Sequence, residues 1–155
     1  MSWQRGRDEI LTMLDKGELT QVVADVDLAQ RLLTAARRHV NSAETVCDSD
    51  PELAYAALYD AIRKALAAML QAQGLRATTE GGHLAVQHAV RAQFGPSMGA
   101  LLRPVDRIRT TRHSIQYPDA ETYIDADNVR TDLPAALELV DAAAKAVPHL
   151  PLFIR

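Results

Sequence analysis

Apolar residues return every three or four positions along most of this chain, which is the spacing of a helix with one buried face. The first long stripe follows two aspartates, Asp25 and Asp27. Either side chain could accept hydrogen bonds from the free N–H groups at a helix start. The pattern therefore predicts a helix from about residue 25 to 47, whose buried face carries Ala29, Leu32, Leu33, Ala36, Val40, Ala43 and Cys47.

The next stripe is wider. After the break "DSDP", Asp50 and Pro51 suit the cap and the first turn of a second helix. From residue 53 to residue 70 the apolar residues come in adjacent pairs, and Gly74 is placed to end the helix in the left-handed conformation. A stripe this wide indicates the central helix of a bundle or a helix that forms a dimer.

Shorter elements precede and follow these two helices. The pattern predicts a short helix over residues 8–16 and another over 83–94, which Gly95 and Pro96 would end. The stretch "ELTQVVADVD" fits either a helical turn or an extended lead-in.

A helix from about residue 97 must stop before Pro118, because the residue before a proline avoids helical geometry. The last helix is expected over residues 129–147. Asp132 would cap it with Pro134 in its first turn, or an earlier start near Asp127 would leave the proline to kink it. The tail, residues 148–155, is expected to be extended.

Composition supports one helical domain. The chain has 155 residues, of which 48% are apolar, with much alanine, and 5% are aromatic. Alanine is the best helix former, and this length suits a single domain. We therefore expect an all-α, single-domain helical bundle of five to six helices over residues 1–155, with its core between residues 25 and 147.

Charge and cysteine content exclude several classes. A formal net charge of −3 argues against global attraction to nucleic acid, so anion binding would need a local patch. The single cysteine, Cys47, excludes an internal disulfide and a multi-cysteine zinc site, and a buried thiol is favoured over a reactive one. No run of 18 apolar residues exists and the N-terminus is polar, so we expect a cytoplasmic protein with no membrane contact.

The local patch is "PVDRIRTTRHSIQYP", residues 104–118. On a continuous helix from residue 98, Arg112 falls on the apolar face, Arg103 and Arg107 fall on the solvated far side, and Arg109 and His113 lie at the edge. An arginine on an apolar face must be paired. It would meet a buried carboxylate such as Asp60, or face a cleft in which an anionic ligand supplies the charge. The apolar face would carry Met98, Leu101, Val105, Ile108 and Ile115.

Arginine beside histidine suits phosphodiester chemistry. A guanidinium binds phosphate through two hydrogen bonds, and an imidazole transfers protons near neutral pH. No acidic cluster appears at metal-ligand spacing, so a metal-free mechanism without a cofactor is the simpler expectation. The other histidines are weaker signals: His83 and His88, on or near one helix, suit helix-end or packing roles. Tyr55 and Tyr59 suit core packing.

The chain resembles the HEPN superfamily (higher eukaryotes and prokaryotes nucleotide-binding), and within it the stand-alone HEPN proteins of actinobacteria. The resemblance rests on "AYAALYDAIRKALAAMLQAQGLRATTEGGHLAVQHAV" (54–90), "LLRPVDRIRTTRHSIQYP" (101–118) and the last helix around "DLPAALELVDAAAKAV" (132–147). It implies a small helical bundle that dimerises. In active members an arginine and, a short interval later, a histidine meet across the dimer to form a ribonuclease cleft.

Two registers of that motif fit. Arg107 and His113 have five residues between them. Alternatively Arg112 is the motif arginine, and Tyr117 then stands where the catalytic histidine would be. The first register implies a metal-independent endoribonuclease, such as a toxin or stress ribonuclease, with Arg107, Arg112 and His113 as catalytic residues.

The second register implies a non-catalytic nucleotide- or nucleic-acid-binding protein, or an accessory subunit, that uses Arg109, Gln116 and Tyr117 for binding. A third reading is that the arginines only stabilise a dimer. The expected partners are a second copy of the chain, RNA or a nucleotide, and a cognate protein.

Overall fold

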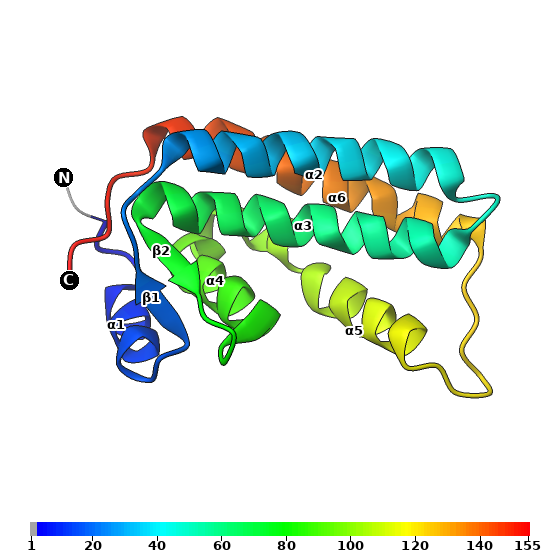
Figure 1. Ribbon diagram of the computed structural model, residues 1–155, viewed down its shortest axis with the longest axis horizontal. Coiled ribbons are helices and arrows are strands. Elements are labelled where there is room, and N and C mark those ends of the chain that lie inside the picture. The colour runs from blue at the N-terminus through cyan, green and yellow to red at the C-terminus, as the bar shows by residue number, and fades with distance from the viewer. Residues whose placement is uncertain (1–2) are drawn as a thin grey trace.

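The fold is an all-α helical bundle, as predicted, in a computed structural model that describes residues 3–155. Helices α2 and α6 lie on one side of α3, and α4 and α5 lie on the other, while α1 and a two-stranded ribbon cover one end (Figure 1). The elements are α1 (Arg7–Asp15), β1 (Leu19–Gln21), α2 (Val26–Val46), α3 (Pro51–Gln73), β2 (Leu75–Ala77), α4 (Gly82–Leu102), α5 (Val105–Gln116), α6 (Ala126–Ala146) and the 3₁₀ turn η1 (Val147–His149).

The two long helices start and end where their capping residues predict. The side chain of Asp25 accepts a hydrogen bond from the Leu28 N–H at 2.8 Å, and that of Asp50 accepts one from the Leu53 N–H at 3.1 Å. Gly74 follows α3 with φ of 81°, a conformation that suits glycine. These sequence-based boundaries are confirmed.

The wide apolar stripe of α3 is buried within the chain itself. Four helices surround α3, and its buried residues include both tyrosines, Tyr55 and Tyr59. The stripe therefore reflects a central helix. It does not by itself require a partner chain.

The stretch after α1 takes the extended alternative. Residues Leu19–Gln21 pair antiparallel with Leu75–Ala77, a short strand that the sequence pattern did not predict. This ribbon joins the lead-in of α2 to the segment after α3. The tail also packs on its own chain: Phe153 is buried, and its N–H donates to the carbonyl of Gln73 at 2.9 Å.

The predicted end of a helix at Gly95 and Pro96 falls just before a kink. Helix α4 runs through both residues, and the non-helical angles of Met98 (φ −119°, ψ 17°) divide it into two helical segments, the second of which ends at Leu102. The helix is interrupted at Arg103 and Pro104, and α5 is a separate helix. A proline can sit inside a helix when local distortion absorbs its missing N–H, so the Gly-Pro pair marked a kink and not an end.

Helix α6 takes the earlier of the two predicted starts. Asp125 caps it, and Asn128 completes a capping box by accepting from the Asp125 N–H. Pro134 lies inside the helix, and Asp132, proposed as a cap, is buried instead. Over residues 3–155, no helix has both the length and the apolar character to cross a membrane.

Candidate functional site

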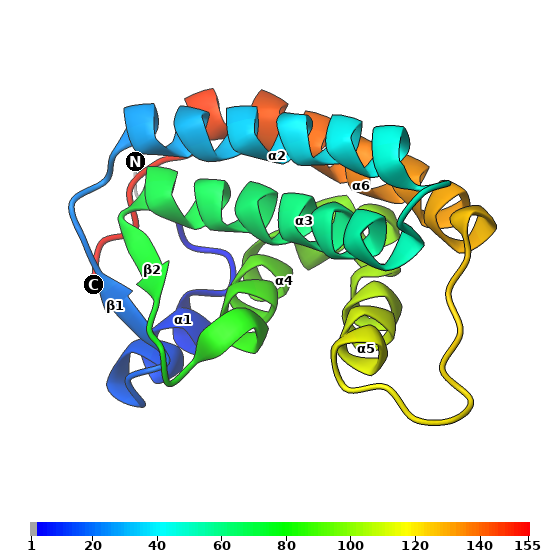
Figure 2. The same cartoon turned by 45° about the vertical axis from the view of Figure 1, so that its right-hand side comes forward.

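A cavity of about 390 Å³ opens between the start of α4 and the polar face of α5. Figure 2 shows these two helices on the same side of α3, with their near ends apart. The cavity lies in this region and reaches α3 at Tyr59. Its lining consists of Tyr59, Gly81, Gly82, His83, Leu84, Arg109, Arg112, His113 and Gln116.

Helix α5 contributes one continuous polar stripe to this cavity. Arg109, Arg112, His113 and Gln116 are spaced three, four and seven residues from the first, so they share one helix face. Arg112 is also four residues after the buried Ile108 and seven after the buried Val105, so its partly buried side chain lies where the apolar side of α5, as predicted, meets the cavity. Met98 and Leu101, which the prediction added to that side, belong to α4.

Arg112 has no carboxylate partner among the described residues. Its guanidinium donates to the side-chain oxygen of Gln116. Asp60, the carboxylate considered for it, is bound by Arg63 and Lys64 from its own helix. Of the two predicted alternatives, the structure has Arg112 at a cleft.

Arg107 carries the ion pair that was expected at Arg112. Its guanidinium donates to both oxygens of Asp132, at 2.9 and 2.5 Å, and the buried hydroxyl of Tyr55 donates to the same carboxylate at 2.6 Å. Arg107 is exposed, as predicted, but the prediction did not include its ion pair with a buried carboxylate. Arg103 is exposed, as predicted.

This triad of Arg107, Asp132 and Tyr55 joins α5, α6 and α3. Burial favours a higher pKa for Asp132, but the hydrogen bonds from Arg107 and Tyr55 outweigh it and lower the pKa below its ordinary value. Burial, together with the bond to Asp132, raises the pKa of Tyr55. Asp132 is therefore ionised and Tyr55 is protonated at neutral pH, and the triad fixes α5 against the bundle.

His83 belongs to the cavity, which sequence reasoning missed. It is the second residue of α4, and its Nδ1 lies 3.3 Å from the hydroxyl of Tyr59. The rings of Tyr59 and His83 are 5.8 Å apart between centroids. The helix start after "EGG" was visible in the sequence, but only the packing of α4 and α5 on the same side of α3 brings His83 into one cavity with His113.

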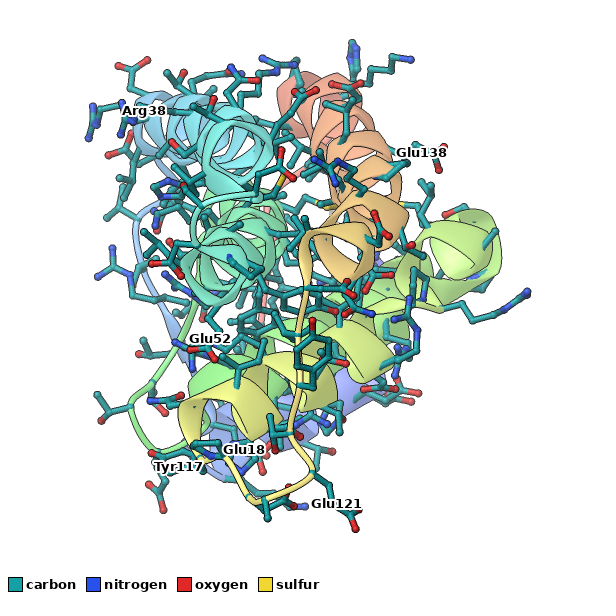
Figure 3. All side chains as sticks on the ribbon, turned by 90° about the vertical axis from the view of Figure 1, so that its right-hand side faces the viewer. Glu18, Arg38, Glu52, Tyr117, Glu121 and Glu138 are labelled. Carbon is teal, nitrogen blue, oxygen red and sulfur yellow. The ribbon has the colours of Figure 1, made fainter. Side chains whose placement is uncertain are left out.

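Tyr117 lies outside the cavity lining. It is the exposed C-cap residue of α5, and its ring lies 4.9 Å from that of His113 between centroids. Figure 3 shows it at the free end of α5, with Glu121 in the loop beyond. Of the predicted site residues, the cavity therefore brings together Arg109, Arg112, His113 and Gln116, while Arg107 and Tyr117 lie outside its lining.

The cavity lining is electropositive. In the described chain it includes two guanidinium groups and two imidazoles, and no carboxylate. Arg109 is only loosely paired, at 4.0 Å from Asp106, and its buried Nε has no hydrogen-bond partner within residues 3–155. The N–H groups of Gly81 and Gly82 at the start of α4 donate to Thr78, and the helix dipole adds partial positive charge at this end. Such a lining suits an anion with several oxygen acceptors.

The remaining candidates are structural. Cys47 is buried at the end of α2, in agreement with the interpretation as a small apolar side chain. The described residues contain no group of three or more histidine, cysteine or acidic side chains that could hold a metal ion. Comparison of the chain with family models, curated proteins and solved structures found no match.

Proposed function

We propose that the cavity binds a phosphate of RNA and that the protein is a HEPN-type, metal-independent endoribonuclease. The observation that carries the proposal is the convergence of Arg109, Arg112 and His113 on one cavity whose lining has no carboxylate. Two arginines without a close carboxylate partner can hold the non-bridging oxygens of a phosphodiester, and an imidazole beside them can transfer a proton.

The proposed reaction needs only protein side chains. A base removes the proton of a ribose 2′-OH, the 2′-oxygen attacks the adjacent phosphorus, and the bond from phosphorus to the 5′-oxygen breaks. An acid protonates the leaving 5′-oxygen. The products are a 2′,3′-cyclic phosphate and a 5′-hydroxyl end. Arg112 stabilises the charge that builds on the phosphate, and Arg109 neutralises the ground-state anion.

A second candidate is a non-catalytic nucleotide- or nucleic-acid-binding protein. It is favoured by Tyr117, which stands where the histidine would be if Arg112 is the motif arginine. Its exposed ring beside His113 offers a surface on which a base can stack. In this case Arg109, Arg112, Gln116 and Tyr117 bind the ligand and no bond is cleaved.

We further propose that the protein acts as a homodimer in the cytoplasm, as the HEPN resemblance implies. The exposed apolar side chains of Leu84 and Tyr117, on either side of the cavity, support an interface on this face. A second copy placed there would put two cavities close together. A cognate protein that covers the same face would hold a toxin or stress ribonuclease inactive.

The test is cleavage of labelled single-stranded RNA by the purified protein in the presence of a chelator. We expect cleavage with 2′,3′-cyclic phosphate ends, and a loss of about 100-fold or more for His113→Ala. Arg112→Lys should also lose activity, because an ammonium cannot make the two-pronged contact. His149→Ala, an exposed histidine outside the cavity lining, is the matched control.

RNA binding that weakens with salt but gives no cleavage would favour the second candidate. If the protein shows no cleavage and no salt-sensitive binding, both candidates are contradicted and the arginines have only a structural role.

A further inference from the structure

We infer that His83, held by Tyr59, faces the bound phosphate across the cavity from His113 and is the second proton-transfer residue of the site. This inference rests on the proposed ribonuclease function. Its basis is the placement of two imidazoles from different helices, α4 and α5, in the lining of one cavity.

A cleavage of this kind needs two proton transfers at opposite ends of the reaction. One removes a proton from the attacking 2′-oxygen, and the other delivers a proton to the leaving 5′-oxygen. These oxygens lie on opposite sides of the phosphorus when attack is in line, so one imidazole reaches both poorly. Two imidazoles on different helices, with Arg109 and Arg112 in the same lining, match this requirement.

Tyr59 gives His83 a defined orientation. The tyrosine is buried on α3, and its hydroxyl is the hydrogen-bond partner of His83 Nδ1 at 3.3 Å. If the proton sits on Nδ1 and is donated to the tyrosine oxygen, Nε2 is left as an acceptor for a substrate hydroxyl. Tyr59 is then a positioning residue that acts through His83.

The environment of His83 favours its role as the base of the reaction. Partial desolvation lowers the pKa of His83, the charges of Arg63 and Arg112 lower it further, and Asp60 opposes them. Burial also raises the pKa of Tyr59, against the charges of Arg109, Arg63 and Arg112, so its hydroxyl stays protonated. A neutral His83, oriented by Tyr59, suits the base that accepts the 2′-OH proton, which leaves His113, in the lining from the other helix, as the acid.

The activity test compares pH–rate profiles. Wild-type cleavage should be bell-shaped, with an acidic limb from the base and an alkaline limb from the acid. His83→Gln should lose about 100-fold in rate and lose the acidic limb, whereas His113→Gln should lose the alkaline limb. Tyr59→Phe keeps the ring, and it should lower kcat and shift the acidic limb while leaving KM nearly unchanged. His88→Ala, an exposed histidine on the same helix outside the cavity, is the control.

A binding test separates this inference from the proposed function. Histidine ring protons are followed by NMR through a pH titration, with and without uridine 3′-monophosphate as the probe. A phosphate that contacts both imidazoles should raise the pKa of both His83 and His113, because its negative charge favours their protonated forms. The pKa of His149 should not change.

Each combination of results is decisive. Cleavage by wild type with an unchanged rate and both limbs in His83→Gln would overturn the inference and leave the ribonuclease proposal standing. No cleavage by wild type would overturn the ribonuclease proposal. In that case, an increase in the pKa of His83 on adding the nucleotide would retain it as a phosphate contact, and an unchanged pKa would overturn this role as well.

Discussion

At the scale of single residues, the arginines of α5 divide into two kinds by what they meet. Arg107 forms an ion pair with the buried carboxylate of Asp132, so its charge is neutralised within the fold. Arg112 and Arg109 lack a close carboxylate in the described structure, so their charges remain available to a ligand. Arg103 and Arg107 are four residues apart and were expected to behave alike. Only the position of Asp132 on a neighbouring helix separates them.

This division predicts unequal effects on stability. Arg107→Ala leaves Asp132 buried with Tyr55 as its remaining partner, and we expect the free energy of unfolding to fall by about 1–3 kcal/mol. This expected loss of stability is smaller than for a fully buried ion pair, because the side chain of Arg107 is partly exposed. Arg103→Ala should change it by less than about 0.5 kcal/mol. Urea unfolding of both variants measures this, and equal effects would contradict the pairing.

The same triad predicts a dependence on pH. The pKa of Asp132 is lower in the folded state than in the unfolded chain, so its ionised form stabilises the fold above the unfolded pKa of about 3.9. That contribution is lost as the pH falls through the folded pKa. The difference in unfolding free energy between wild type and Asp132→Asn should therefore be constant from pH 5 to 7 and shrink below about pH 4. A difference that stays constant down to pH 3 would contradict it.

At the scale of elements, the site depends on where α4 begins. Gly81 precedes its first turn, and a Cβ at this position would lie 2.7 Å from the Cβ of Ala85 and closer still to the carbonyl oxygen of Glu18. The backbone of Glu18 leads into β1, so it cannot move freely. The ribbon of β1 and β2 therefore fixes the start of α4, and with it the place of His83 in the cavity.

We expect Gly81→Ala to lower the free energy of unfolding by about 1–3 kcal/mol, because α4 must shift away from residue 18. Gly99→Ala is the matched control, since a Cβ there meets nothing within 4 Å and alanine favours the helix. It should be neutral or stabilising by up to about 1 kcal/mol. Thermal unfolding distinguishes the two, and a neutral Gly81→Ala would show that the start of α4 is adaptable.

At the scale of the whole molecule, the apolar surface left exposed on the cavity face bears on assembly. We expect light scattering at micromolar concentration to give a mass of about twice 17.0 kDa. Leu84→Glu, at the cavity, should give the monomer mass. Leu137→Glu, an exposed leucine on α6 on the opposite side of α3, should leave the dimer intact. A monomeric wild-type protein would contradict the proposed dimer.

The sequence by itself determined the bundle and most of its boundaries. Helical periodicity, Asp25 and Asp50 as caps, and Gly74 as a terminator are local signals, because each acts on backbone groups within a turn of itself. It also placed Arg109, Arg112, His113 and Gln116 at spacings that share one face of a helix. The apolar side of α5, with Val105 and Ile108, borders that face, whereas Met98 and Leu101 belong to α4.

Only the tertiary structure decided which arginines form ion pairs within the fold and which remain available to a ligand. Asp132 pairs with Arg107 across two helices, and His83 reaches the cavity of His113 because α4 and α5 both pack on α3 and the ribbon fixes the start of α4. Neither contact has a sequence signal, since the partners are far apart in the chain and meet only through packing. Periodicity gives the face that a residue occupies on its own helix. What lies opposite that face depends on the angles and breaks between helices, such as the one at Arg103 and Pro104.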